Sequence, residues 1–228
     1  MRLIAIDSST DTLSVACGDG RTFAVREERS GTAHAERALP RIREVLAEAG
    51  FTLGMLDAIA FGAGPGAFTG VRIACGIAQG LSLGSGVPVV AVGTLAALAQ
   101  EAWRAHAATG VVACLDARMR EVYVASYERE GDAWREVAPP SVAKPDAVAA
   151  SASSFGAGDG FAAWPGLAAR LGLARVDPAL RPTARAIGEL AVPAILRGEA
   201  VPARDAQPHY VRHRVALTAG ERALGERL

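Results

Sequence analysis

The chain has 228 residues, and half of them are hydrophobic, so it can bury a sizeable core as one domain or as two small lobes. Its 24 basic and 24 acidic residues balance, which excludes a global electric field that would draw it to nucleic acid or to an anionic membrane. Three well-separated cysteines without a CxxC pair are typical of small buried residues in a reducing compartment, and we expect a cytoplasmic protein.

The N-terminal residues predict a three-stranded meander. Residues 3–6 form an apolar strand that ends at Asp7, residues 13–17 form a second strand, and residues 22–26 complete the meander after the Asp19-Gly20 hairpin signal. Asp7 comes too early for the apolar segment of a signal peptide.

An amphipathic helix is expected next, over about residues 34–49, with Gly50 as its end. Pro40 either kinks this helix or marks its true first turn. The predicted buried stripe consists of Ala35, Leu39, Ile42 and Leu46.

A glycine-rich turn over residues 61–72 organises the rest of the chain. Its four glycines and Pro65 predict a bent but stiff loop between an apolar strand (residues 57–61) and an uncharged helical run. We expect Thr69 to cap that helix and Arg72 to project from its first turn.

Two familiar phosphate-binding loops do not fit this turn. A Walker loop needs Lys-Ser or Lys-Thr after its last glycine, where this chain has Val71-Arg72. A dinucleotide fingerprint needs another glycine spacing and an acid about 20 residues on, but no acid lies between Asp57 and Glu101. A structural turn that presents a helix is therefore favoured over a generic nucleotide loop.

Residues 73–100 carry no charge and are long enough to span a bilayer. Residues 84–88, Gly-Ser-Gly-Val-Pro, break this run, so a buried helix, a strand over 89–92 and a helix from Thr94 are expected, without a membrane span. Gly76, Gly80 and Gly84 lie four apart on one helix face, which lets another helix approach closely, either within the chain or from another chain.

The second half of the chain repeats the first. A shift of 109 residues places Asp7 on Asp116, with strands expected over residues 111–116 and 122–127. A weaker sequence similarity relates residues 61–66 to residues 155–160. These matches predict a duplicated α/β architecture with a cleft between two lobes, although two hairpins can also resemble each other by chance. The expected boundaries are residues 1–100 for the first lobe, 101–210 for the second lobe and 211–228 for a C-terminal helix or tail, for which packing on the first lobe is one of two open assignments.

The rest of the chain carries fewer secondary-structure signals. Pro139-Pro140 predicts a turn, Pro145 opens a short helix, a longer helix is expected from Pro182 to Leu196, and residues 202–208 form a linker. His209 and His213 have the spacing of helical metal ligands. Pro208 precedes them and no third ligand is evident, so surface histidines are favoured and no metal site is expected.

Asp7 and Asp116 would face each other across the cleft, where paired carboxylates can hold a hydrated metal and nucleotide phosphates. Ser8 and Ser9 suit phosphate, but residues 117–121 place bulky side chains in the second turn. This asymmetry predicts a degenerate, vestigial nucleotide site. Two acids that merely cap their turns are an equal alternative.

Several stretches of the sequence together resemble the TsaB (YeaZ) family. They are residues 4–9, 34–42, 64–72, 93–95, 116–123, 158–160 and 208–212, and the match covers nearly the whole chain. The resemblance implies a duplicated actin-like or Hsp70-like ATPase (ASKHA) fold, in which mixed sheets flanked by helices form two lobes.

The resemblance further implies a non-catalytic scaffold subunit. Such a subunit works with a TsaD-like catalytic subunit and a TsaE-like ATPase in threonylcarbamoyl transfer to adenosine 37 of tRNA, reaches tRNA through the complex, and forms a homodimer when alone. The HxxxH metal motif of TsaD is reduced here to His34, with Ala38 in the second place. No cofactor is expected in the isolated chain, and the sequence leaves open whether ATP or ADP binds at the partner junction. One rival is an ATP-binding transferase or ATPase with its own site in the cleft, and a second is a self-associating protein with another client.

The expected partner interface lies on two helices of the first lobe. It comprises His34, Leu39, Ile42, Leu46, Arg72, Ile73, Gly76, Ile77 and Gly80.

Overall fold

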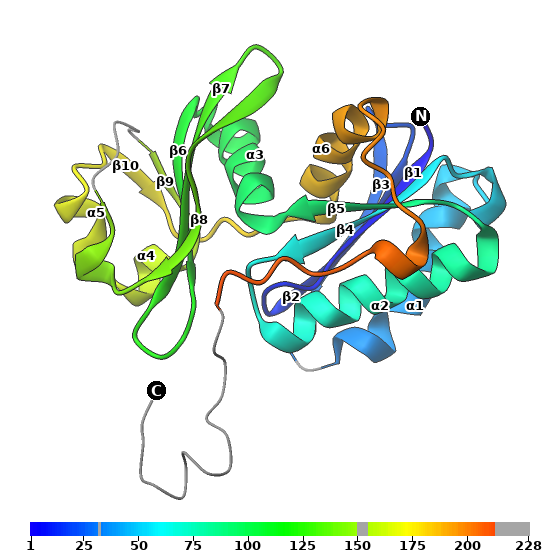
Figure 1. Cartoon of the computed structure of the whole chain (residues 1–228), viewed down its shortest axis with the longest axis horizontal. Helices are drawn as coiled ribbons and strands as arrows, with labels where there is room; N and C mark the ends of the chain where they lie inside the picture. Colours follow the sequence, from blue (N-terminus) through cyan, green and yellow to red (C-terminus); the bar gives the residue numbers. More distant parts are fainter. Residues whose placement is uncertain (32, 150–154, 213–228) are drawn as a thin grey trace, which may run out of the picture.

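Two five-stranded sheets lie side by side in the computed structural model, which describes residues 1–31, 33–149 and 155–212 (Figure 1). The first sheet has the order β3-β2-β1-β4-β5 and the second has the order β10-β9-β6-β7-β8. The elements up to the second sheet are β1 (Leu3–Asp7), β2 (Thr12–Gly18), β3 (Phe23–Arg29), α1 (His34–Ala49), η1 (Leu53–Met55), β4 (Ala58–Gly64), α2 (Phe68–Ser85), β5 (Val89–Gly93) and α3 (Thr94–His106). Those that follow are β6 (Gly110–Asp116), β7 (Val122–Glu130), β8 (Ala133–Ala143), η2 (Pro145–Ala147), β9 (Phe155–Ala157), α4 (Gly160–Ala163), α5 (Gly166–Arg170), β10 (Arg175–Asp177), α6 (Ala184–Leu196) and η3 (Ala203–Asp205).

The two sheets have the same topology, which confirms the predicted duplication. In each sheet the first strand pairs antiparallel with the second and parallel with the fourth, as β1 does with β2 and β4, and β6 with β7 and β9. Asp7 ends β1 and Asp116 ends β6, so the 109-residue shift relates equivalent strand ends.

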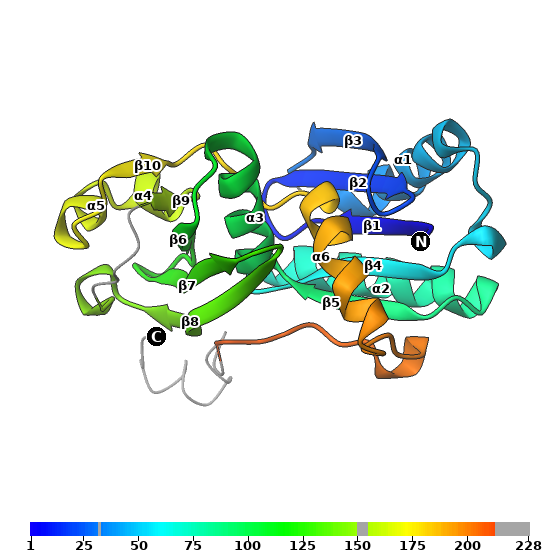
Figure 2. The ribbon, with the colours of Figure 1, turned by 90° about the horizontal axis from the view of Figure 1, so that it is seen from above.

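Both faces of the first sheet are covered, and the side chains alternate accordingly. Ile4 and Ile6 point to a core beneath α1 and α2, whereas Leu3 and Ala5 point to a second core beneath α6. Figure 1 shows α6 on the opposite side of the sheet from α1 and α2, and Figure 2 shows the same layers from above.

The second sheet is likewise enclosed on both faces. Leu95, Leu98 and Ala102 of α3 pack on one face of it, and Phe161 and Leu167 from α4 and α5 pack on the other. In chain order α6 follows the second sheet, yet it contacts β1, β2, β4 and β5. The second lobe therefore does not run continuously over residues 101–210 as expected, because α6 returns to bury its apolar face on the first sheet.

Two predicted details of the helices are wrong. Thr69 does not cap α2: the helix begins at Phe68, its N-cap residue is Ala67, and no side chain caps it. The buried stripe of α1 consists of His34, Ala38, Ile42 and Val45. Of the predicted stripe only Ile42 is buried, because Ala35 and Leu39 face solvent and Leu46 is half-buried.

The prolines are accommodated within elements. Pro139 and Pro140 lie inside β8 and not in a turn, and they fall on an edge strand where its register with β7 shifts, a place where a missing N–H costs least. Pro40 lies inside α1 and does not mark its first turn. None of the helices in the described ranges is long and apolar enough to cross a bilayer.

Residues 206–212, which we call the interlobe strap, run from beside α2 toward the second lobe (Figure 1). The carbonyl of Ala206 accepts a hydrogen bond from Gln79 Nε2 at 3.0 Å, and the amide of His209 donates to Ala63 O at 2.7 Å. Arg212 Nη2 reaches Glu121 Oε2 in the second lobe at 2.5 Å. The strap thus ties both lobes together. His213, one of the two spaced histidines, and the expected C-terminal helix from residue 213 onward lie outside the described residues.

Candidate functional site at the lobe junction

The glycine-rich turn packs against the turn that follows β1. A Cβ atom at Gly70 would lie 1.8 Å from Ser8 O, and one at Gly66 would lie 2.5 Å from Ser9 O. The amide of Ala67 donates to Ser9 O at 2.7 Å, and the Ser8 hydroxyl donates to Gly70 O at 2.8 Å. Glycine is therefore required for close backbone approach. One amide and one carbonyl of the loop are thus used in packing against Ser8 and Ser9, which supports the favoured structural interpretation over a phosphate cradle.

Asp7 lies inside the first lobe and does not line the cleft. Its side chain is fully buried, and Oδ1 lies 1.9 Å from the place that a Cβ of Gly62 would take. Oδ2 accepts hydrogen bonds from the hydroxyl and amide of Ser9, but Oδ1 has no partner among the described residues. Burial raises the pKa of Asp7 from an ordinary value of 3.8 to about 7, and the Ser9 hydrogen bonds oppose this shift. The expectation that Asp7 faces Asp116 across the cleft is therefore wrong.

His34 stabilises the turn that carries Thr10. Its Nε2 lies 3.0 Å from Thr10 O, and its Nδ1 lies 2.7 Å from the Ser30 hydroxyl. A carbonyl oxygen only accepts, so Nε2 carries the proton and Nδ1 accepts from the hydroxyl. Both ring nitrogens are thus engaged within the chain, and the buried Ala38 offers no second ligand.

A cavity of about 580 Å³ lies between the lobes. It is lined from the first lobe by Ser9, Thr10, Asp11, His34 and residues of the glycine-rich turn, and from the second by Asp116, Arg118 and Asp159, with His209, Tyr210 and Arg212 of the interlobe strap. The chemistry of this lining is mixed, since it includes three carboxylates and two guanidinium groups, those of Asp11, Asp116, Asp159, Arg118 and Arg212.

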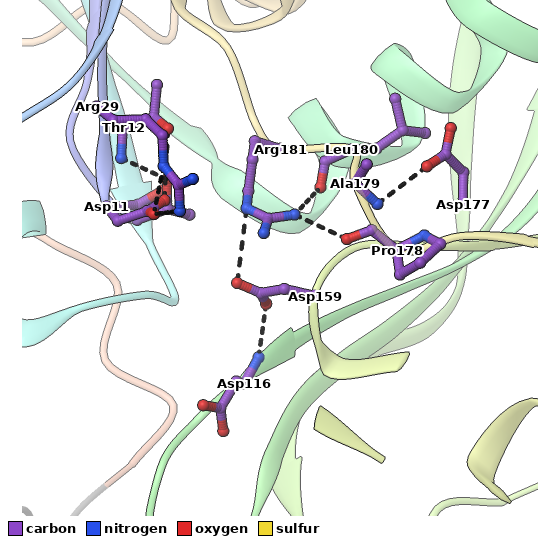
Figure 3. Close-up of polar contacts among 12 residues, drawn as sticks. Asp11, Thr12, Arg29, Asp116, Asp159, Asp177, Pro178, Ala179, Leu180 and Arg181 are labelled. Carbon is purple, nitrogen blue, oxygen red and sulfur yellow. Dashed lines mark hydrogen bonds and ion pairs between the residues drawn. The ribbon is translucent and has the colours of Figure 1, made fainter. Parts of the chain in front are cut away.

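The carboxylates at this junction are paired, and Figure 3 shows the contacts of Asp11 with Arg29 and of Asp159 with Arg181. Arg29 holds Asp11 with two hydrogen bonds of 2.6 and 3.1 Å, which lowers the pKa of that carboxyl. Asp159 accepts from the backbone amide of Asp116 at 2.9 Å and faces Arg181 at 3.6 Å. The Asp116 carboxylate is in turn held by the amide and guanidinium of Arg118, both at 3.0 Å. Asp116 thus lines the cavity as a turn-capping acid.

The turn after Asp116 is strained. Arg118, Met119 and Arg120 all have positive φ angles, of 59°, 53° and 62°. Left-handed backbone costs roughly 1–2 kcal/mol for each such residue, or on the order of 3–6 kcal/mol for the three together. The short turn from Asp116 to Glu121 imposes this geometry: Ala117 N donates to Glu121 O at 3.1 Å and Glu121 N donates to Arg118 O at 2.9 Å.

The residues present do not fit a metal-nucleotide complex in the isolated chain. Asp7 is enclosed within the first lobe, Asp116 is ion-paired with Arg118 at 3.0 Å, and the glycine-rich turn packs its backbone against Ser8 and Ser9. Across the described ranges, no three His, Cys, Asp or Glu side chains come together in a way that could hold a metal ion.

One face of α2 has no partner among the residues that the structure describes. Gly76, Gly80 and Gly84 are exposed, and a Cβ at each would meet no atom within 4 Å beyond its own helical turns, as far as the described residues go. Leu83 is 78% exposed on the same helix, and Leu39 of α1 is 50% exposed. An internal contact for the glycine row is therefore excluded within the described part of the chain.

The other residues expected at a partner interface divide into two groups. His34 and Ile42 are buried in the first lobe and are unavailable to a partner, contrary to the expectation. Arg72 is exposed, but its Nε donates to the Tyr210 hydroxyl at 2.8 Å and its guanidinium lies 3.9 Å from the Phe68 ring centroid. Leu46, Ile73 and Ile77 are half-buried along the edges of the two helices.

Sequence reasoning missed the interlobe strap, Asp159 and Arg181. A non-periodic segment gives no signal of where it docks. The repeat of residues 61–66 at 155–160, however, did point to the turn that carries Asp159.

Known proteins resemble this chain over nearly its whole length. The family model described as "TsaD: tRNA N6-adenosine threonylcarbamoyltransferase" matches residues 25–162. Two relatives carry the name tRNA threonylcarbamoyladenosine biosynthesis protein TsaB. The Escherichia coli protein is 40% identical to this chain, over 95% of this chain and 96% of the relative. The Haemophilus influenzae protein is 39% identical, over 94% of this chain and 95% of the relative. A solved structure, YeaZ from Pseudomonas aeruginosa, superposes with a TM-score of 0.84 at 41% identity, covering 92% of this chain and 99% of that one. On these grounds the chain belongs to the TsaB (YeaZ) family.

Proposed function

We propose that this chain acts in threonylcarbamoyladenosine formation in tRNA, as a non-catalytic subunit that docks a TsaD-like catalytic protein. The TsaB relatives carry the name of that biosynthesis. The observation that carries the docking role is the exposed face of α2 with its row of Gly76, Gly80 and Gly84.

Glycine at these positions weakens α2 by roughly 0.5–1 kcal/mol each relative to alanine. No atom of the described chain outside their own turns requires it, so the cost has no internal explanation. A helix from another chain that approaches closely would explain it. Leu83 on the same helix, which is 78% exposed, supplies apolar area that such a helix would bury.

The rival function, an ATP-dependent enzyme in its own cleft, has less support. It needs ionised carboxylates and free loop amides at the junction, whereas Asp7 is enclosed and Asp116 is paired with Arg118. The proposed role therefore leaves the chemistry to the partner.

The remaining partners follow from this role. The same α2 face would join two copies of the chain when the catalytic partner is absent. A TsaE-like ATPase would act on the assembled complex in the cytoplasm, where tRNA is reached through the catalytic subunit. ATP or ADP would bind at the partner junction, where a second chain adds the groups that this one lacks.

Replacement of Gly80 by Leu tests the proposal. Leucine is the better helix former, so Gly80→Leu should raise the free energy of unfolding by up to about 1 kcal/mol while it weakens binding to the TsaD-like protein at least tenfold. Gly80→Ala should weaken binding less, because it adds one methyl group. Gly54→Leu, at an exposed glycine of η1 with no atom within 4 Å of its Cβ, is the matched control and should leave binding unchanged. Unaltered affinity of Gly80→Leu, measured by calorimetry, would remove this face from the interface.

A further inference from the structure

A second cavity, of about 700 Å³, lies in the second lobe. We call it the lobe-two groove, and the residues that matter in its lining are Met119, Arg120, Lys144, Asp146, Trp164 and Arg170. It is formed by the strained turn after β6, by η2 and by the α4–α5 connection. Figure 1 shows α4 and α5 at the end of the molecule away from α1 and α2, so the groove is separate from the proposed docking face.

The groove is positively charged in a chain of zero net charge. Arg120, Lys144 and Arg170 face one acid, Asp146. The Arg170 guanidinium is held in the wall of the groove by hydrogen bonds, because its Nη2 donates to the carbonyl of Val148 at 2.8 Å and to that of Pro145. Arg120 and Lys144 are exposed and form no ion pair with any residue in the described ranges. Two cationic side chains are therefore available to a ligand.

An aromatic ring completes the groove. Trp164 is half-buried between α4 and α5, packed on one side against the core cluster beneath the second sheet. Met119, in the left-handed turn, also lines the groove. A flat indole surface beside unpaired cations is the combination that binds single-stranded nucleic acid, in which bases stack and phosphates meet basic side chains.

We propose that the lobe-two groove binds a nucleotide unit, with its base stacked on Trp164 and its phosphates facing Arg120 and Lys144. The choice of an RNA strand as its source rests on the proposed role in tRNA modification, and this direct contact would add to the binding of tRNA through the catalytic subunit. The strained turn supports the assignment, because it holds Met119 and Arg120 at the groove in backbone that L residues rarely adopt, and such strain is concentrated at functional sites.

The first test is binding of a fluorescein-labelled single-stranded RNA to the full chain, followed by anisotropy at several salt concentrations. Arg120→Ala and Lys144→Ala should each reduce the slope of log K against log salt by about 0.7. Trp164→Ala should weaken binding roughly 5- to 150-fold, and Trp164→Phe, which keeps a ring for stacking and packing, much less. Arg21→Ala, an exposed arginine between β2 and β3, is the matched control and should change neither quantity.

Lys144 offers an independent readout because it is the only lysine in the chain. An amine-reactive reagent should modify it in the free protein, and RNA should protect it, as measured by mass spectrometry. Competition with adenosine monophosphate separates the two sources of the ligand. Displacement of RNA at equal nucleotide concentration indicates a site for free nucleotides, and displacement only at large excess indicates a strand.

Three results would overturn the proposal. The first is the absence of RNA binding, and the second is wild-type affinity and salt slope in both Arg120→Ala and Lys144→Ala. The third is binding of poly-glutamate with the same affinity as RNA, if Trp164→Phe and Trp164→Ala leave that affinity unchanged. Trp164 contacts the core, so the RNA affinity of Trp164→Ala is compared with that of the wild type only if the two melting curves match. If they do not match, the result with Lys144→Ala decides. Gly80→Leu should bind RNA normally and Lys144→Ala should bind the TsaD-like protein normally, so failure of either proposal is visible without the other.

Discussion

Replacement of Asp7 by asparagine should remove a pH dependence from the stability of the first lobe. Asp7 is fully buried and its pKa is raised to about 7, whereas in the unfolded chain it ionises near 3.8. As the pH rises between these values, the unfolded chain loses this proton and the folded chain keeps it. Wild-type stability therefore falls across this window and levels off above the folded pKa.

The magnitude follows from the size of the shift. About three pKa units at roughly 1.4 kcal/mol each give at most about 4 kcal/mol, lost as the pH rises from about 4 to about 8. An asparagine side chain cannot ionise, and its amide oxygen can still accept the hydrogen bonds from Ser9. The stability of Asp7→Asn relative to wild type should therefore improve steadily with pH.

Urea unfolding followed by circular dichroism at several pH values measures this difference, and the titration of all other groups cancels in it. Asp57→Asn should change the pH dependence of stability in the opposite direction. The backbone amide of Arg2 lowers the pKa of Asp57, so the stability that the ionised Asp57 contributes is lost as the pH falls. A difference between Asp7→Asn and wild type that stays constant from about pH 4 to pH 8 would refute the account of Asp7 as a buried neutral acid.

Three further results are expected. Gly70→Ala should destabilise the chain by on the order of 1–3 kcal/mol in thermal unfolding, because its Cβ would lie 1.8 Å from Ser8 O. Gly76→Ala in the same helix should instead stabilise the chain by roughly 0.5–1 kcal/mol. Equal effects of the two substitutions would contradict the packing of the glycine-rich turn. Arg212→Ala should release the interlobe strap and speed hydrogen exchange of the His209 amide, and unchanged exchange would show that the Glu121 pair does not hold the strap. Cys17 and Cys114 are buried, and burial raises the pKa of each to about 12, so a thiol reagent should reach them only at the rate of unfolding; rapid labelling of native protein would contradict their burial.

The duplicated architecture was predictable because its signals are local. Each half begins with an apolar strand that ends in an acid, and alternation fixes which residues face the core. The buried stripe of α1 was misassigned because Ile42 fits a helical period with Ala35 and Leu39 as well as it does with Ala38 and Val45. The sheet alone decides between the two faces.

The site could be predicted only in part, because its contacts join distant parts of the chain. Gly70 meets Ser8 across 62 positions, and Arg72 meets Tyr210 across 138. The internal repeat indicated that Asp7 and Asp116 end equivalent strands, but the depth at which Asp7 lies depends on Gly62 beside it. No pattern in the sequence announces the lobe-two groove, which three separate segments form.

The central claim is that this chain is a required but non-catalytic subunit. Threonylcarbamoyl transfer to tRNA, measured in a mixture of a TsaD-like protein, a TsaE-like ATPase and the threonylcarbamoyl-adenylate source, with and without this chain, tests it most directly. We predict that transfer depends strictly on the chain, is lost with Gly80→Leu, and survives Asp7→Asn, while the chain alone hydrolyses no ATP. Transfer that proceeds equally without the chain, or ATP hydrolysis by the chain alone that Asp7→Asn abolishes, would contradict the account.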